Sequence, residues 1–306
     1  MNRSFYFSLL LLPTLLGLPH AQSAEEKPAE KLTDTELKFP GIFNSVLPGT
    51  EKRSHFKFLL HPHIGDLSKI DYIRNDLGFA YGINNQWEVS AKTRVYFGNG
   101  LKDATFGQDL GLADYELGSK YQLGKSILKD WDSAVALNYA SPIGHPVSDV
   151  TDGLVHREAT LSFAKPLEKR PDLRVFWGLT ADFISQTGID ARIEDNQLRD
   201  SHQRFYGGVI YTRGATTYTL ETSYDTTRIW GDTKEDVYGI RPGILFPIPR
   251  RFTFNSSGKW LLGLATPVTY GPDGTDVGIQ VKMRLDFDFK RLIRGSRYKP
   301  EEPEER

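Results

Sequence analysis

The chain is 306 residues long and contains 38 Lys or Arg, 39 Asp or Glu and no Cys. The near balance of charge excludes the basic surplus that is typical of nucleic-acid-binding proteins, so we expect no nucleic-acid partner. The absence of Cys excludes disulfide bonds, thiol chemistry and attachment as a lipoprotein.

The first 24 residues have the three parts of a secretory signal peptide. Arg3 provides the positive charge, residues 5–18 form an apolar run, and residues 21–24 offer cleavage after Ser23 or Ala24. The run is too short for a membrane-spanning helix, and no later stretch reaches 18 consecutive apolar residues. We therefore expect an exported chain, with an uncleaved anchor as the less favoured alternative.

Residues 25–53 are predicted to form a periplasmic linker and lead-in to the main domain. Residues 25–38 are highly charged and have no apolar period, which is typical of a flexible segment. Residues 39–50 contain two Pro and two Gly and are expected to be irregular.

Alternation of apolar and polar residues dominates residues 54–289. In the stretch 275–289, every second residue from Val277 to Phe289 is apolar, and the residues between them are Gly or polar. Side chains of a β-strand point alternately to opposite faces, so such a stretch forms a ribbon with one apolar and one charged side. We expect 12 such strands, at 54–64, 70–82, 86–97, 111–123, 131–141, 154–164, 173–185, 202–213, 216–226, 236–246, 257–269 and 276–289.

The connections between these strands alternate in length. Short or moderate connections such as 83–85, 165–172 and 214–215 alternate with longer ones such as 98–110 and 186–201. Short turns on one rim and long loops on the other are typical of outer-membrane barrels, whose short turns face the periplasm. Because the predicted number of strands is even, both termini are expected in the periplasm.

The polar face is predicted to point into the barrel and the apolar face to lipid. Charged residues occur in mid-strand, where an outward position would meet hydrocarbon at a high free-energy cost. Many apolar rows end in an aromatic residue suited to an interfacial girdle; these are Tyr81, Phe97, Tyr121, Tyr139, Phe183, Tyr224, Phe246 and Phe289. The sequence therefore predicts an all-β fold, a transmembrane antiparallel up-and-down β-barrel over residues 54–289, with an exported soluble β-sandwich as the alternative.

Residues 290–306 form a charged, Pro-containing tail that we expect to be periplasmic and solvated. Phe289 is the aromatic residue that would end the last strand, and we expect the barrel-assembly machinery to act on that strand. The other expected partners are outer-membrane lipid and small-molecule solutes.

Several His, Ser and Asp residues have side chains suited to a metal site or a catalytic site. His61 and His63 share one strand face and, with Asp66, have ligand types suited to a metal, although a solvated lumen pair is the favoured interpretation. His145 and His156 lie near Ser141 and Ser148 in sequence, which leaves open a lipid-modifying hydrolase.

The Asp-Gly-x-Ser stretch and Ser-Arg pair of the barrel phospholipases do not occur in the predicted strands. We therefore expect no enzymatic activity, no cofactor and no metal.

The residues predicted to line the lumen carry charges of both signs in nearly equal number. Strongly selective pores use one sign of charge, so this balance favours a weakly selective pore or an interior closed by ion pairs. The latter would suit a third alternative, a structural or adhesive barrel with a plugged lumen. Our candidates for selectivity are Arg94, Glu116, Lys120, Arg204, Glu221 and Arg241.

The hairpin over residues 77–89 (LGFAYGINNQWEV) resembles those of bacterial outer-membrane transporters grouped with the meta-pathway phenol-degradation barrels. Residues 114–121 (DYELGSKY) are similar to the strand that follows in that group. The resemblance implies passive passage of small solutes, hydrophobic or aromatic ones among them, across the bacterial outer membrane. The charged tail after Phe289 departs from the usual ending of such barrels, and no catalytic residue carries over.

Overall fold

The computed structural model describes residues 42–64, 72–98, 110–143, 150–151, 153–187, 201–227, 236–249, 252, 259–272 and 274–288. The predicted signal peptide, the tail and Phe289 lie outside these residues. Among the described residues, no helix has the length and apolar character that crossing a bilayer requires.

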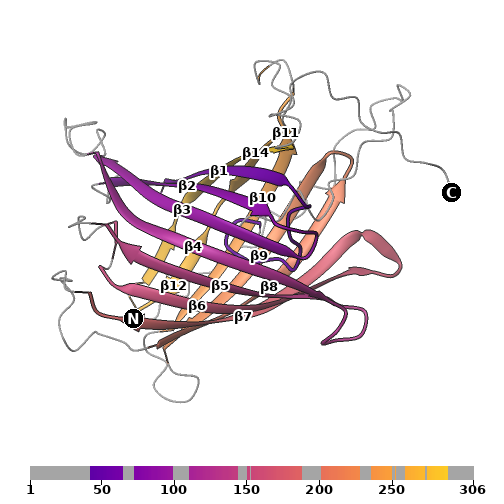
Figure 1. The fold of residues 1–306 in the computed structure, drawn as a ribbon, viewed down its shortest axis with the longest axis horizontal. Helices are drawn as coiled ribbons and strands as arrows, with labels where there is room; N and C mark the ends of the chain where they lie inside the picture. The colour runs from indigo at the N-terminus through magenta and orange to yellow at the C-terminus, as the bar shows by residue number, and fades with distance from the viewer. Residues whose placement is uncertain are drawn as a thin grey trace, which may run out of the picture. The chain divides into compact units, whose positions relative to one another are not determined.

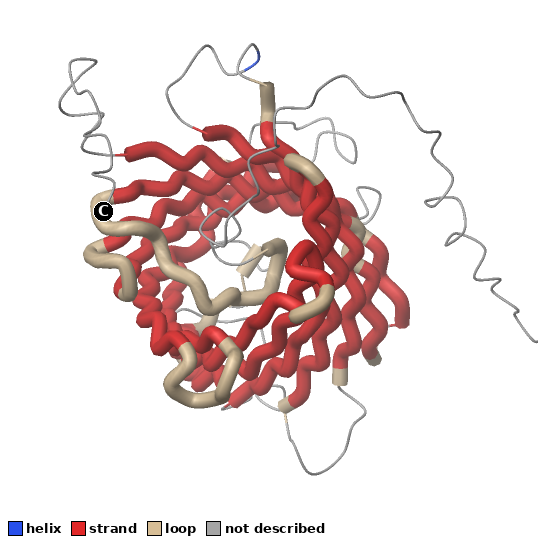
Figure 2. The backbone as a smooth tube through the Cα atoms, turned by 90° about the vertical axis from the view of Figure 1, so that its right-hand side faces the viewer, coloured by secondary structure: helices blue, strands red, loops and turns tan. Residues whose placement is uncertain are grey.

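The described strands form a single antiparallel sheet that closes on itself (Figures 1 and 2). The strands are β1 (His55–Ile64), β2 (Tyr72–Gly82), β3 (Trp87–Gly98), β4 (Gly111–Gly124), β5 (Asp132–Pro142), β6 (Val155–Leu167), β7 (Arg170–Ser185), β8 (Ser201–Arg213), β9 (Thr216–Thr226), β10 (Val237–Pro247), β11 (Lys259–Ala265), β12 (Val268–Gly271), β13 (Gly274–Val277) and β14 (Ile279–Asp288).

From β1 to β10 each strand pairs with the next one in the chain, and β11 and β12 both pair with β10. The last strand, β14, pairs with β11 and returns to pair with β1, where His55 lies opposite Asp288. Among the described strands, all except β13 are paired on both sides, and β13 pairs with β12. The prediction of a closed antiparallel barrel with 12 strands is therefore confirmed, because β11 continues into β12 and β13 into β14.

The breaks inside these last two strands were not predicted. Pro267 follows β11 and has no N–H to donate to the ladder. Its carbonyl instead accepts a hydrogen bond of 3.0 Å from the backbone N–H of Gly278, which separates β13 from β14. The two irregularities thus face each other across one pair of strands and form a single local disruption.

The turn between β6 and β7 is tighter than the predicted connection at 165–172. The strands extend to Leu167 and Arg170, so only residues 168–169 remain between them. The register shifts after Pro166, which again lacks a donor, and the extra residues are absorbed in that irregularity.

Pairing fixes which side chains face the interior. On β3, for example, Glu88, Lys92 and Arg94 lie opposite Lys120, Glu116 and Asp114 of β4, and all are polar. The intervening positions on β3 include Trp87 and are mostly apolar. The apolar outward and charged inward faces follow the predicted alternation around the barrel.

Aromatic side chains form outward rows near both rims. Tyr115 and Tyr139 lie 6.1 Å apart between ring centroids, and Tyr224 and Tyr238 lie 5.0 Å apart, near the rim with long connections. Phe163 stacks on Trp177 at 4.2 Å near the rim with short turns. Such belts are typical of the two membrane–water interfaces.

Candidate functional site

The interior of the barrel contains the predicted selectivity residues and an irregular piece of chain. All six predicted residues occupy inward positions in the strand register; they are Arg94, Glu116, Lys120, Arg204, Glu221 and Arg241. They come from β3 and β4 and from β8 to β10, and their environments fall into two groups.

Arg94 lies at the centre of a charge cluster on β2, β3 and β4. Its Nε is 3.1 Å from Oδ1 of Asp76, and its Nη1 is 2.8 Å from Oδ2 of Asp114. The same Nη1 is 3.4 Å from the carbonyl oxygen of Val150, which belongs to the connection before β6. One guanidinium therefore bridges the carboxylates of the two neighbouring strands.

Further ion pairs link neighbouring strands inside the barrel. Lys92 Nζ lies 2.5 Å from Oε2 of Glu116, and Lys120 Nζ lies 3.2 Å from Oε1 of Glu88. Such cross-strand pairs neutralise much of the charge that the sequence places on the inward face. They stabilise the wall and weaken the electrostatic field inside the barrel.

Arg204 belongs to a second cluster on β8 and β9. Its Nε lies 2.5 Å from Oδ1 of Asp225, and His202 Nε2 lies 3.5 Å from the same oxygen. Arg241 of β10 lies opposite Glu221 in the register, and its buried Nε has no hydrogen-bond partner among the described residues.

Residues 42–54, which we call the N-terminal segment, lie inside the ring of strands (Figure 2). The carboxylate of Glu221 holds one end of the segment by accepting three backbone hydrogen bonds. Their donors are the N–H groups of Phe43 (3.0 Å), Asn44 (3.1 Å) and Ser45 (2.8 Å). Successive N–H groups that converge on one carboxylate form an anion-binding concavity of the backbone.

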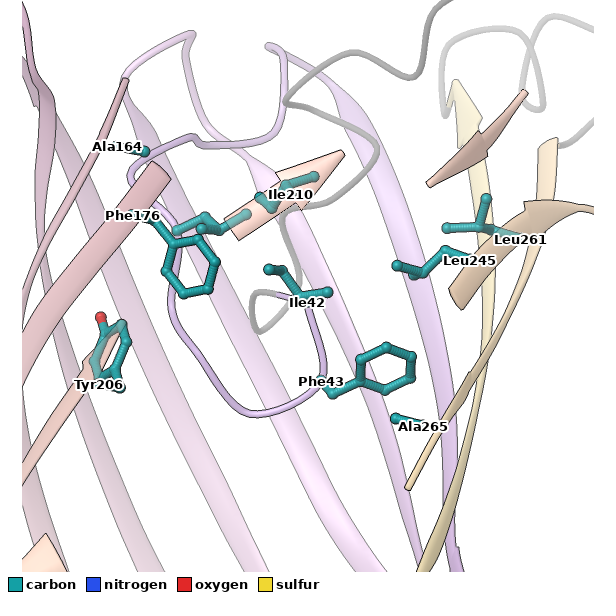
Figure 3. Close-up of a cluster of buried hydrophobic side chains, with 10 residues drawn as sticks. Ile42, Phe43, Ala164, Phe176, Tyr206, Ile210, Leu245, Leu261 and Ala265 are labelled. Carbon is teal, nitrogen blue, oxygen red and sulfur yellow. The ribbon is translucent and has the colours of Figure 1, made fainter. Parts of the chain in front are cut away.

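Apolar side chains of the N-terminal segment pack against the inner wall. Ile42, Phe43 and Leu47 form a buried cluster with residues of β6–β8, β10 and β11 (Figure 3). The wall residues of this cluster are Ala164, Phe176, Tyr206, Ile210, Leu245, Leu261 and Ala265. The cluster gives the barrel an apolar core in its interior, where the alternation predicted polar groups.

Two glycines make room for the ring of Phe43. A Cβ at Gly243 would lie 2.4 Å from Cε2 of Phe43, and a Cβ at Gly263 would lie 3.1 Å from its Cε1. Any side chain at Gly243 would therefore displace the ring. The absence of a Cβ at Gly243 and Gly263 leaves space on the inner wall for this one ring.

Polar contacts hold the rest of the N-terminal segment. The hydroxyl of Tyr206 donates to the carbonyl of Val46 at 3.0 Å, and the hydroxyl of Thr50 donates to the carbonyl of Asn85 at 2.9 Å. The backbone N–H of Glu51 donates to Oε2 of Glu88 at 2.8 Å. These partners lie on β8, on the β2–β3 turn and on β3, so the segment contacts distant parts of the wall.

Buried cations on β1 and β14 complete the attachment. Lys57 pairs with Glu51, and Lys282 donates to the carbonyl of Ile42. Arg284 is also fully buried, and its nearest ion-pair partner is Asp286, with Nε 3.6 Å from Oδ1. The N-terminal segment therefore bridges β1, β14 and the opposite wall, and it extends from Asn85 at the rim with short turns to Glu221 and Lys282 in mid-strand.

The histidine-based sites find no support in the described geometry. His156 faces the interior, where its Nδ1 is 2.6 Å from Oδ2 of Asp182, whereas Ser141 has an outward position on β5. They lie on opposite sides of the wall and do not form a catalytic pair. His145, Ser148 and Asp66 lie outside the described residues. Among the residues that are described, no cluster of three or more His, Asp or Glu is arranged to hold a metal.

The N-terminal segment was not predicted to lie inside the barrel. Its irregular structure was expected from its Pro and Gly content, but its position was not. The available signal was composition, because Ile42, Phe43, Val46 and Leu47 are more apolar than a solvated linker requires. Its contacts join residues up to 240 positions apart, as between Lys282 and Ile42, and have no local pattern.

No protein-family model matches the chain, and no curated protein sequence is similar enough to count as a match. Among solved structures, the fold is similar to that of the COG4313 outer-membrane channel from Pseudomonas putida F1. That structure has a TM-score of 0.50 and 11% identity, over 81% of this chain and 98% of that one.

The NanC porin gives a TM-score of 0.48 at 10% identity, over 75% of this chain and 98% of that one. The KdgM porin gives a TM-score of 0.45 at 10% identity, over 76% of this chain and 99% of that one. The resemblance to the phenol-degradation group remains a prediction. The chain thus shares its barrel fold with the COG4313 outer-membrane channel structure.

Proposed function

We propose that this chain forms an outer-membrane channel for passive passage of small solutes, hydrophobic or aromatic ones among them. The observation that carries the proposal is the two-sided wall of the closed barrel. Its outward face is apolar with aromatic belts, as lipid requires, and its inward face is charged, as a water-filled path requires. Residues 1–24 supply the export signal for this location.

Both termini lie in the periplasm in this proposal. The turns at 83–86, 168–169 and 214–215 are short and share one rim, whereas the connections at 99–110 and 186–200 belong to the other rim. The N-terminal segment contacts Asn85 and Glu88, beside the first of these short turns. The N-terminal segment therefore enters the lumen from the periplasmic mouth.

The clusters around Arg94 and Arg204, together with Glu116, Lys120, Glu221 and Arg241, would set selectivity. Most of these charges have a partner of opposite sign nearby. We therefore propose weak ion selectivity, with discrimination coming mainly from the width left beside the N-terminal segment. Neither a cofactor nor a metal enters this function.

Single-channel recording of the full-length protein in a planar bilayer tests the proposal. We expect a small, steady conductance, and partial block by small aromatic or sugar solutes would begin to identify the substrate. A correctly folded barrel that stays silent, and that also fails to admit solutes in liposome swelling, would contradict the channel.

A second candidate function is a structural or adhesive barrel, and the N-terminal segment is the observation that favours it. Its apolar cluster and its bonds to Glu221 are those of a fixed internal element. The same recording separates the two functions, because a permanently plugged barrel conducts nothing until the segment is removed.

We propose no enzymatic role, because a lipid hydrolase needs its Ser and His together on the lipid side. The pairing of His156 with Asp182 in the interior supports this view. Action of the barrel-assembly machinery on the last strand, ending at Phe289, remains a prediction.

A further inference from the structure

The outer face of β4–β7 carries an open hollow of about 540 Å³. It is lined mainly by outward side chains, namely Leu117, Leu137, Tyr139, Arg157, Ala159 and Phe183. The hollow exists because Ala159 pairs with Leu137 on one side and Ala181 on the other, so two neighbouring small side chains lie among large ones. A groove of this shape on an apolar wall fits an extended hydrocarbon chain.

Arg157 lies at one end of this hollow, near the rim with long connections. It is exposed on the outward face, in register between Tyr139 and Phe183 of the aromatic row. Its Nη1 donates to Oγ of Ser185 at 2.9 Å, and among the residues that the structure describes no carboxylate pairs with it. The exposed guanidinium has further N–H donors for which the described residues provide no partner.

A charge on the lipid-facing side is costly at mid-membrane and much less so near the interface. Near an interface, a guanidinium binds phosphate with two parallel hydrogen bonds, which a lysine or an amide cannot reproduce. Arg157 therefore has the position and the unused donors to bind a lipid phosphate. The apolar hollow beside it would hold one of that lipid's acyl chains.

We propose that this hollow is a binding site for a phosphorylated glycolipid of the outer leaflet. Its phosphate would bind Arg157, and one acyl chain would lie over Ala159 between Leu137 and Phe183. In the proposed orientation the long connections face outward, so the hollow lies in the outer leaflet. We therefore propose a glycolipid of that leaflet rather than a phospholipid. The site rests on the proposed outer-membrane location but not on conduction, because it lies on the opposite side of the wall from the lumen.

Native mass spectrometry of the full-length protein in detergent tests the site, with diphosphoryl lipid A, phosphatidylglycerol and phosphatidylcholine as separate probes. The variants are Arg157→Gln, which removes the charge, and Ala159→Trp, which fills the hollow but keeps Arg157. Lys165→Gln is the matched control, because Lys165 is an outward cation near the other end of β6, placed over the ring of Trp131.

We expect one lipid A per barrel in the wild type and in Lys165→Gln. Binding should weaken roughly tenfold in Arg157→Gln, which is the scale of one charge-assisted hydrogen bond. Ala159→Trp should weaken it as well. Equal binding by all four proteins would overturn the site, and so would phosphatidylglycerol that binds as tightly as lipid A.

Conductance of the same preparations separates this proposal from the proposed function. Arg157→Gln should conduct as the wild type does. A silent wild type that still binds lipid A through Arg157 would contradict the channel alone. If the wild type conducts and Arg157→Gln binds lipid A as tightly as the wild type does, the lipid site alone is contradicted.

Discussion

Phe43 donates its backbone N–H to Oε1 of Glu221 at 3.0 Å, although the two residues are 178 positions apart in the chain. The ring of Phe43 also packs against Gly243 on the inner wall. The two contacts together fix one end of the N-terminal segment against β9 and β10. The width of the lumen therefore depends on a few contacts that substitution can remove one at a time.

Replacing Glu221 with Ala should loosen the N-terminal segment and raise the single-channel conductance. Three backbone donors would lose their charged acceptor, and hydrogen bonds to charged groups contribute roughly 1.5–3 kcal/mol each. Glu158→Ala is the control, because Glu158 is another inward carboxylate, whose side chain bonds Asn138 instead. Unchanged conductance and noise in Glu221→Ala would mean that this carboxylate does not hold the segment.

Replacing Gly243 with Ala should displace Phe43, because the added Cβ would lie 2.4 Å from its ring. Gly263→Ala should have a weaker effect, since the corresponding distance is 3.1 Å. Thermal unfolding of the three proteins in detergent provides the measurement.

Phe43→Ala should reduce the cost of Gly243→Ala, because it removes the contact with the ring and leaves the one with Oγ1 of Thr219, at 2.7 Å. The double variant should therefore be more stable than the sum of the two single effects predicts. Additive effects would show that the clash is relieved elsewhere.

Arg94→Glu and Arg204→Glu should shift the reversal potential in a salt gradient toward cation selectivity. Arg94 already contacts Asp76 and Asp114, so the substitution would put three carboxylates together on the inner wall. Lys165→Glu makes the same change of charge on the outer wall and should leave the reversal potential where it was. An unchanged reversal potential in both inward variants would show that Arg94 and Arg204 do not line the conducting path.

Leu137→Arg should impair folding into lipid vesicles far more than Asn138→Arg does. Leu137 faces outward, where an arginine costs up to about 2–4 kcal/mol near the bilayer midplane. Asn138 faces inward beside Glu158, which would pair with the new cation. Urea unfolding in vesicles compares the two variants, and equal stability would argue against the assignment of lipid-facing and lumen-facing sides.

The barrel itself could be predicted because its determinants are local. Alternation in stretches such as residues 87–97 fixes both the strand and its two faces, and each strand pairs with its neighbour in the chain. The predicted strands accordingly lie within a few residues of those observed. The misplaced ends occur at Pro166 and Pro267, where a missing donor shifts the register or interrupts the strand.

The interior could be predicted only in part. The inward positions of Arg94 and Glu221 follow from alternation, but their partners do not. Arg94 bonds Asp76 and Asp114 of its two neighbouring strands. Glu221 instead bonds Phe43, whose place in the lumen depends on packing across the whole barrel. The periodicity of the sequence does not predict a contact between residues so far apart in the chain.

The covalent link between the N-terminal segment and β1 affects any departure of the segment from the lumen. Because Ser54 continues directly into His55 of the wall, a detached segment would remain tethered near its binding site. A short tether keeps such a group at an effective concentration on the order of millimolar, whatever the amount of protein present. Rebinding would therefore be fast and intramolecular, unlike the capture of a separate blocking subunit, and each barrel would open and close independently of its neighbours.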